Sequence, residues 1–246
     1  MQRGVATVAL CFLLILSGCS ALPGGTSGDS PPGVEDGALN NSSALVDAHS
    51  SALTESGYTH EVRLNQSQLI NGNLANITRK QRTNVTAGAG EYRFQLINGG
   101  DANSRFVIWG NETVEYQRIE ISGGDPQYRQ SEPTPPRALS GVAIFEPQLT
   151  APFEVVDRSE VDGTTLVTLE ATGQPTSEKA FPSDAESIRN YEARLVVDTQ
   201  GRIHEFTASA DYDLNGESTS YDLSYAVTSF ESPDVQRPSW VDELEG

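Results

Sequence analysis

Tight-turn dipeptides divide most of the chain into short β-prone runs, and this feature restricts the fold more than any other. Asn-Gly, Gly-Asn and Asp-Gly tolerate the positive φ angles that a two-residue hairpin turn needs. The dipeptides that suit such a turn are Asn71-Gly72, Gly110-Asn111, Asp162-Gly163 and Asn215-Gly216, with Gln200-Gly201 as a weaker candidate. Strands joined by tight turns pair antiparallel, because a parallel sheet needs long crossover connections. We therefore expect an α+β fold that is mainly β and is built on an antiparallel meander.

The last hairpin predicts its own pairing register. A two-residue loop at Asn215-Gly216 sets Leu214 opposite Glu217, Tyr212 opposite Thr219, Ala210 opposite Tyr221, Ala208 opposite Leu223 and Phe206 opposite Tyr225. This set is largely apolar and aromatic, whereas the alternate residues, such as Asp211 and Ser220, are polar. One face of the hairpin should therefore be buried and the other should be solvated.

Two helical segments are expected beside the strands. Between Ala38 and Gly57 apolar residues recur at helical spacing, and Gly57 is a stop signal. The residues of this spacing are Leu45, Ala48, Ala52 and Leu53, and His49, on the same face, is expected to pack at the edge of the core. A short helix is expected over 138–149, ended by Pro147 and Pro152, and prolines predict loops over 125–136 and 173–184.

Residues 1–18 have the organisation of a signal peptide. Arg3 is their only charge, and an apolar run extends from Val5 to Leu16. As a helix this run is about 18 Å long, whereas a bilayer core needs about 20 residues. The run is therefore too short for a permanent membrane anchor.

The tetrapeptide Leu16-Ser17-Gly18-Cys19 resembles the lipobox of prokaryotic lipoproteins, in which the signal is removed before the cysteine and its thiol is lipidated. The resemblance implies lipid attachment at Cys19 and a place on the extracytoplasmic face of the cell membrane. The alternative is an ordinary signal peptide that happens to contain a cysteine.

The rest of the chain divides by composition. Residues 19–37 are mostly Ser, Gly, Pro and Asp, and predict a lipidated, flexible tether. A β-rich domain is expected over 38–232, followed by an acidic tail over 233–246 in which Trp240 is the residue expected to dock.

The formal net charge is −18, and it becomes −19 once the predicted signal peptide with Arg3 is removed. Such a chain is repelled by nucleic acid and by anionic head groups, so the covalent lipid must supply the membrane attachment. Lys80 and Lys179 are the only lysines, and this composition resembles that of salt-in halophile proteins. The resemblance implies a haloarchaeal origin, and the alternative is an acidic surface protein from another source.

Motifs for catalysis or cofactor binding do not stand out. The sequence has no GxSxG or HExxH string, and its three histidines lack metal-ligand spacing. The residues Asp211, Asp213, Asn215, Gly216 and Asp222 match the spacing of an EF-hand calcium loop. Their flanks alternate with period two instead of forming helices, so a hairpin is the better interpretation. We expect no enzyme activity, no metal and no cofactor.

Asn-x-Ser/Thr sequons begin at Asn40, Asn41, Asn65, Asn76, Asn84 and Asn111. The hairpin register at Asn71-Gly72 places Asn65, Asn76 and Asn84 on one strand face, together with charged residues. This face is expected to be solvated. The sequence therefore predicts glycosylation among Asn65, Asn76, Asn84 and Asn111.

A helix followed by a long meander with a short helical insert resembles the half-barrel of the LolA and LppX-like lipoprotein carriers, and the layout also resembles haloarchaeal lipoproteins. The segment Leu195–Ile203 looks like the late hairpin of the carriers. The resemblance implies a half-barrel over 38–232 whose concave face binds an apolar ligand such as a lipid or isoprenoid. The expected lining residues are Phe94, Trp109, Phe206, Tyr212, Tyr221 and Tyr225. The alternative is a surface interaction or structural protein in which these side chains fill the core.

Overall fold

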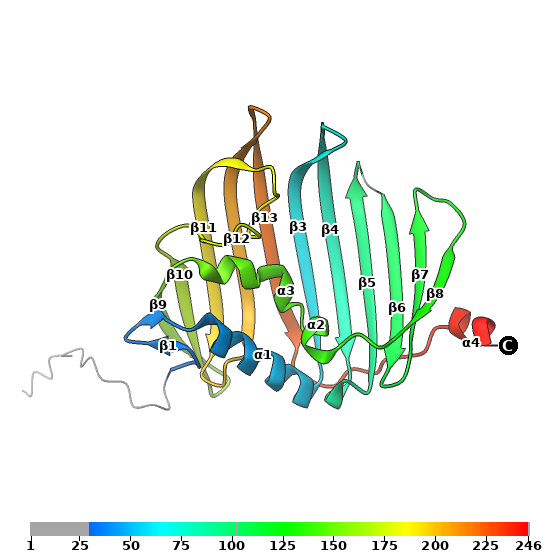
Figure 1. Cartoon of the computed structure of the whole chain (residues 1–246). Coiled ribbons are helices and arrows are strands. Elements are labelled where there is room, and N and C mark those ends of the chain that lie inside the picture. Colours follow the sequence, from blue (N-terminus) through cyan, green and yellow to red (C-terminus); the bar gives the residue numbers. More distant parts are fainter. Residues whose placement is uncertain (1–29, 102, 246) are drawn as a thin grey trace, which may run out of the picture.

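The computed structural model describes residues 30–101 and 103–245, and in them the strands form one open antiparallel sheet (Figure 1). Its order is β1-β2-β9-β10-β11-β12-β13-β3-β4-β5-β6-β7-β8, so the chain builds one half, then the other, and closes the middle with β13 beside β3. The strands are β1 (Val34–Glu35), β2 (Ala38–Leu39), β3 (Tyr58–Ile70), β4 (Asn73–Val85), β5 (Glu91–Gly100), β6 (Ser104–Asn111), β7 (Glu115–Ile121), β8 (Gln127–Ser131), β9 (Phe153–Val161), β10 (Thr164–Ala171), β11 (Glu186–Asp198), β12 (Ile203–Leu214) and β13 (Glu217–Ser229). The expected mainly β, α+β fold is confirmed.

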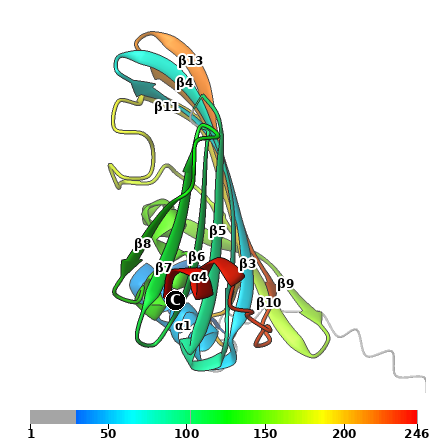
Figure 2. The same cartoon turned by 90° about the vertical axis from the view of Figure 1, so that its right-hand side faces the viewer.

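Three α-helices lie on one face of the sheet, which we call the inner face; the opposite face is the outer face (Figure 1). The inner helices are α1 (Ser42–Ser56), α2 (Pro136–Leu139) and α3 (Val142–Phe145), and the remaining helical elements are η1 (Ala87–Ala89), η2 (Glu146–Thr150) and α4 (Ser239–Glu245). The upper ends of β4, β11 and β13 bend over the inner side, so the sheet is curved (Figure 2).

Helix α1 forms as the sequence predicts. The side chain of Asn41 caps its first turn by accepting a hydrogen bond from the backbone N–H of Ala44 at 3.0 Å, and Gly57, with φ of 73°, ends it. Its buried face, including Leu45 and Leu53, packs on the sheet.

The helical insert differs from the expected single helix. It is split into α2, α3 and η2, because Gly141 takes a left-handed conformation with φ of 78° between the first two. Gly141 also lies so close to the sheet that a Cβ there would be 2.9 Å from Cε1 of His60. A glycine is therefore required by both the turn and the packing.

Of the expected turns, those at Asn71-Gly72, Asp162-Gly163 and Asn215-Gly216 form with positive φ at both residues. The register of the last hairpin is confirmed from Leu214↔Glu217 to Phe206↔Tyr225. The weaker candidate, Gln200-Gly201, lies in a longer loop between β11 and β12.

The prediction of a two-residue hairpin turn at Gly110-Asn111 is wrong. Gly110 is inside β6, opposite Tyr92 and Glu115, and the chain reverses after Asn111. There the side-chain oxygen of Asn111 accepts hydrogen bonds from the backbone N–H groups of Thr113 and Val114, which makes an Asx turn instead of a two-residue hairpin.

The segment 125–136, expected as a loop, contains edge strand β8. Residues 30–37, the described part of the expected tether, include β1 and the buried Val34, so residues before Ala38 pack on the sheet. The expected signal peptide and Cys19 lie outside the described residues. Within residues 30–101 and 103–245, no helix has the length and apolar character that crossing a bilayer requires.

Candidate ligand-binding face

Four of the six expected lining residues fill the core instead of lining an open cavity. Phe206, Tyr212, Tyr221 and Tyr225 lie on the inner face of β12 and β13 and are at most 4% exposed. The ring of Phe145 from α3 packs on this set, with centroids 4.7 Å from Tyr225 and 5.4 Å from Phe206. The space between the helices and this part of the sheet is therefore packed with aromatic side chains.

Hydrogen bonds join His49 and Tyr225 to each other and to the backbone in this core. The backbone N–H of Ile203 donates to Nδ1 of His49 at 3.0 Å, so Nε2 of His49 carries the proton and donates to the hydroxyl of Tyr225 at 2.9 Å. The hydroxyl of Tyr225 donates in turn to the carbonyl of Ser140 at 3.1 Å. Burial raises the pKa of Tyr225 well above its ordinary value, so the phenol stays a donor.

A loop closes the upper end of this core. Phe181, in the irregular segment 172–185, lies against the rings of Tyr191, Tyr212 and Tyr221, and its centroid is 5.3 Å from that of Tyr221. Gln148 holds the loop by donating to the backbone carbonyl of Ala180. The expected binding surface around Tyr212 and Tyr221 is thus occupied by the chain's own phenylalanine.

Trp109, another expected lining residue, is on the outer face. It pairs with Arg93 and Tyr116, and it is buried beneath the C-terminal segment by Val235 and Val241. The expectation that it lines the concave face is wrong, because alternation along β6 turns it away from the helices.

Phe94 does face an open part of the inner side. Across β5 and β6 it pairs with Ile108, and Leu96 pairs with Phe106 in the next row. All four side chains are half-buried, and no helix lies over the upper part of β5 to β7 (Figure 1). We call these four residues the inner wall.

The register assigns the inner wall to its face. Val62, which is in the core beneath the helices, pairs with Gln81, and the row continues through Leu96 and Phe106 to Ile119. Directly paired residues share a face. Leu96, Phe106 and Ile108 were not among the expected lining residues. The sequence did contain the signal, because Leu96 is two residues from Phe94 and Ile108 is two residues from Phe106, so each pair shares one face of its strand.

One arginine, Arg79, lies at the border of the inner wall. Arg79 lies on the inner face of β4, and its Nε donates to Oδ1 of Asn98 at 3.4 Å. Asn98 is itself held by the hydroxyl of Ser104, which accepts from Nδ2 of Asn98 at 2.9 Å. Thus a polar row of β4, β5 and β6 adjoins the apolar row of Leu96 and Phe106.

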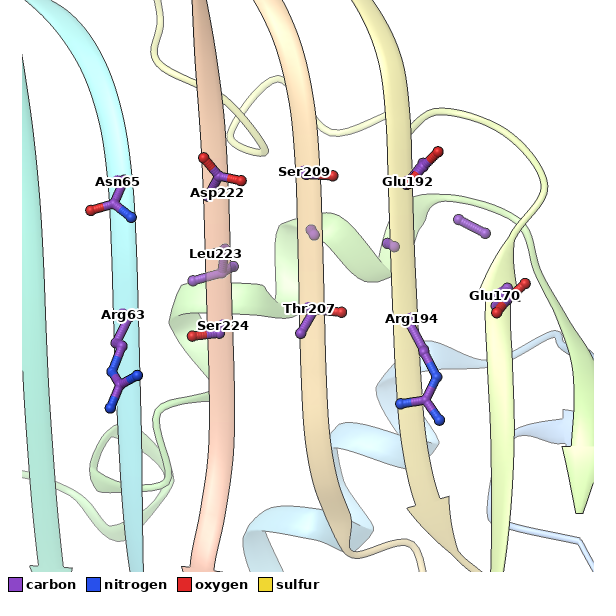
Figure 3. Close-up of a pocket in the computed structure, with 13 residues that line it drawn as sticks. Arg63, Asn65, Glu170, Glu192, Arg194, Thr207, Ser209, Asp222, Leu223 and Ser224 are labelled. Carbon is purple, nitrogen blue, oxygen red and sulfur yellow. The ribbon is translucent and has the colours of Figure 1, made fainter. Parts of the chain in front are cut away.

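A different hollow of about 740 Å³ lies on the outer face, across β3 and β10 to β13 (Figure 3). Arg63, Ser224, Thr207 and Arg194 form one row of its floor, while Asn65, Asp222, Ser209 and Glu192 form the next. Its labelled side chains are almost all polar or charged (Figure 3). This hollow therefore does not suit an apolar ligand.

The expected glycosylation residues also lie on outer surfaces. Asn65, Asn76 and Asn84 share the outer face of β3 and β4, and the first two are exposed. Asn76 and Asn84 accept hydrogen bonds from Ser67 and Thr59, whereas Asn111 lies in the exposed turn after β6. Their glycosylation stays a prediction.

The residues of the EF-hand-like spacing are engaged within the sheet. Asp213 forms an ion pair with Arg189 at 2.7 Å, and Asp211 accepts from Asn190 at 2.7 Å. Among residues 30–101 and 103–245, no group of three or more His, Cys, Asp or Glu side chains is arranged to hold a metal.

Comparisons with known proteins give one family and distant structures. The model of a family of unknown function, DUF7537, matches residues 4–244. The lipoprotein LppX of Mycobacterium tuberculosis is similar with a TM-score of 0.35 and 11% identity, over 78% of this chain and 96% of LppX. A LolA superfamily protein of Nitrosomonas europaea is similar with a TM-score of 0.24 and 8% identity, over 81% of this chain and 96% of that protein. The comparison of this chain with curated proteins found no match.

Proposed function

The chain belongs to DUF7537, a family of unknown function, and we propose that it is a binding module for an apolar, lipid-like ligand, held on the extracytoplasmic side of a membrane by lipid on Cys19. The observation that carries the binding proposal is the inner wall: Phe94, Leu96, Phe106 and Ile108 face an uncovered part of the curved sheet in two adjacent pairs.

The energetic argument is the incomplete burial of these side chains. Complete burial of a Leu, Ile or Phe side chain contributes about 1.5–3 kcal/mol, so half-buried ones leave part of that free energy to be gained from a ligand. Beneath α1, α3 and the loop that carries Phe181, the apolar surface of the inner face is already covered. We therefore assign the ligand to the wall of β5 and β6, beside the packed core.

The packed core also supports a second candidate, a surface interaction or structural protein with no ligand. Phe206, Tyr212 and Tyr225 are fully buried, so the chain's own aromatic side chains fill the core beneath the helices. The two candidates differ in whether apolar molecules bind the inner wall.

Binding of Nile red, a neutral apolar probe, together with mass spectrometry of lipid extracted from the purified chain, tests the binding proposal. Leu96→Asp and Phe106→Asp place a charge on the inner wall and should each weaken Nile red binding by about tenfold or more and reduce extracted lipid, because the cost of desolvating the carboxylate beneath an apolar ligand adds to the lost apolar contact. Ile97→Asp is the matched control, since Ile97 lies on the same strand, is 51% exposed and faces outward. A wild-type chain that carries no lipid and does not bind Nile red would support the second candidate.

The proposed attachment to the membrane through lipid on Cys19 is tested separately. Replacing Cys19 with serine removes the thiol that the lipobox resemblance assigns to the lipid. We expect the variant to move from the membrane to the soluble fraction and to lose the mass of the lipid. Full retention in the membrane at an unchanged mass would contradict the anchor.

A further inference from the structure

The inner face of β4 to β8 differs in charge from the rest of the molecule, because its available charges are positive. Along β4 to β8, the inward-facing residues include three charged ones, which are Arg79, Glu115 and Arg129. Glu115 is 2% exposed, and its carboxylate accepts hydrogen bonds from Tyr92, Thr134 and other neighbours. The two arginines are thus the available charges on this face of a chain whose formal net charge is −18.

Arg79 lacks a carboxylate partner among residues 30–101 and 103–245. The ion pairs of these residues involve other arginines, and the one polar contact of Arg79 is the hydrogen bond from Nε to Asn98 at 3.4 Å. Its two terminal nitrogens are left for another acceptor. The side chain is partly buried, with the buried Ile77 next on the same face of β4.

An arginine in this position is unexpected on structural grounds alone. The chain has more than twice as many acidic as basic residues, 34 against 16, yet no carboxylate of the described residues forms an ion pair with this partly buried cation. The hydrogen bonds from Asn98 to Ser104 and from Arg79 to Asn98 hold the guanidinium in place from one side. A planar guanidinium with free donors is suited to bind a carboxylate or a phosphate through two hydrogen bonds.

We infer that the ligand of the inner wall is an anionic amphiphile whose carboxylate or phosphate head group binds Arg79. This inference rests on the proposed function and adds the chemistry of the ligand. The row of Arg79 and Asn98 adjoins the row of Leu96 and Phe106, and the row of Phe94 and Ile108 follows. These rows span about 14 Å along the strands, so the head group binds at one end and the apolar chain lies over the wall.

The lower end of this path is closed. Next to Phe94 and Ile108, Tyr92 belongs to the same buried cluster as Leu139 of α2. The apolar chain of the ligand therefore lies toward this cluster, and its head group lies at the opposite end of the inner wall, beside the partly buried Arg79.

Three probes with twelve carbon atoms each test the inference: dodecanoate, dodecyl phosphate and dodecanol. Affinities of the full chain are measured by displacement of Nile red. The wild type should bind at least one anionic probe about tenfold or more tightly than dodecanol, since a hydrogen bond to a charged group contributes about one to two powers of ten. The ratio of dodecanoate to dodecyl phosphate identifies the preferred head group.

Arg79→Gln should lose about 10- to 100-fold in affinity for the preferred anionic probe and leave dodecanol binding unchanged. Lys80→Gln is the matched control, because it removes the same charge from the next residue of β4, which is exposed on the outer face. Asn98→Leu keeps the charge but removes the oxygen that orients it, and should cause a smaller loss.

Equal affinity of the wild type for the three probes, or equal behaviour of the Arg79 and Lys80 variants, would overturn the inference while the proposed function stands. If none of the probes and no Nile red binds the wild type, the proposed function fails and the inference fails with it.

Discussion

His49 and His60 are fully buried between α1, α2 and the sheet, and both are neutral there. Burial, together with the nearby His60, lowers the pKa of His49 to about 3, and burial lowers the pKa of His60 to about 3. His60 stacks on Tyr58 and accepts a hydrogen bond from Gln81. The sequence placed His49 on the buried helix face, but it gave no indication that His60 lies in the same cluster.

This pair predicts acid sensitivity. In the unfolded chain each histidine has its ordinary pKa of 6.5, so between about pH 6.5 and about pH 3 the unfolded state binds more protons, and the free energy of unfolding falls as the pH falls. The expected slope is about 1.4 kcal/mol per pH unit for each histidine. Burial alone would raise the pKa of Asp198, but hydrogen bonds from His204 and Arg202 lower it overall, so this carboxylate acts in the same direction.

Urea unfolding between pH 4 and pH 7 measures the slope. His60→Gln should be less stable at pH 7 but should lose stability less steeply on acidification. Identical slopes for the variant and the wild type would refute the assignment of this acid sensitivity to His60.

The C-terminal element covers the outer face, and it does so more extensively than its composition suggests. Val241 of α4 is fully buried against Trp109, and Arg237 lies over the indole at 5.1 Å while pairing with Asp242 at 2.9 Å. Trp240, which the sequence marks as the docking residue, is half-buried and lies near Tyr128. Val235 and Val241, which look unremarkable in an acidic tail, are the residues of this segment that are buried against the sheet.

Tryptophan fluorescence should detect the release of α4 from the outer face of the sheet. In a Trp240→Phe background, which leaves Trp109 as the only tryptophan, Val241→Asp should shift the emission of Trp109 to longer wavelength, because a buried charge is expelled with the helix. Leu244→Asp on the same helix should cause no shift, since Leu244 is 44% exposed. The same emission from both variants would contradict the docking.

At the scale of the whole molecule, charge is distributed unevenly across the sheet. Residues 58–131, which form β3 to β8, hold eight of the 16 basic residues but only seven of the 34 acidic ones. The remainder of the chain thus carries a net charge of −19, and self-repulsion is concentrated in β9 to β13, the helices and the tail. The acidic composition of the whole chain therefore does not hold for β3 to β8.

Salt should stabilise the molecule by screening this repulsion. The Debye length falls to about 3 Å at 1 M salt, so the thermal midpoint should rise from dilute buffer to molar KCl and fall again on desalting. Sucrose is the control, because it favours burial without screening charge. Full thermal stability in low-salt buffer would contradict the expectation drawn from the composition.

The sequence determined the features that are set locally. The turn at Asn215-Gly216 fixes the register of β12 and β13, and the periodicity before Gly57 fixes α1, because both depend on neighbours along the chain. The shared face of Asn65, Asn76 and Asn84 followed in the same way from strand alternation.

Tertiary structure decided what covers each face. Alternation says which residues lie together, but it does not say which distant element packs on them. Thus Trp109 is buried by the C-terminal segment, Tyr212 and Tyr221 by the loop of Phe181, and Phe94 stays partly exposed on the inner wall. The physical reason is that burial depends on contacts between segments far apart in the chain, which no local period encodes.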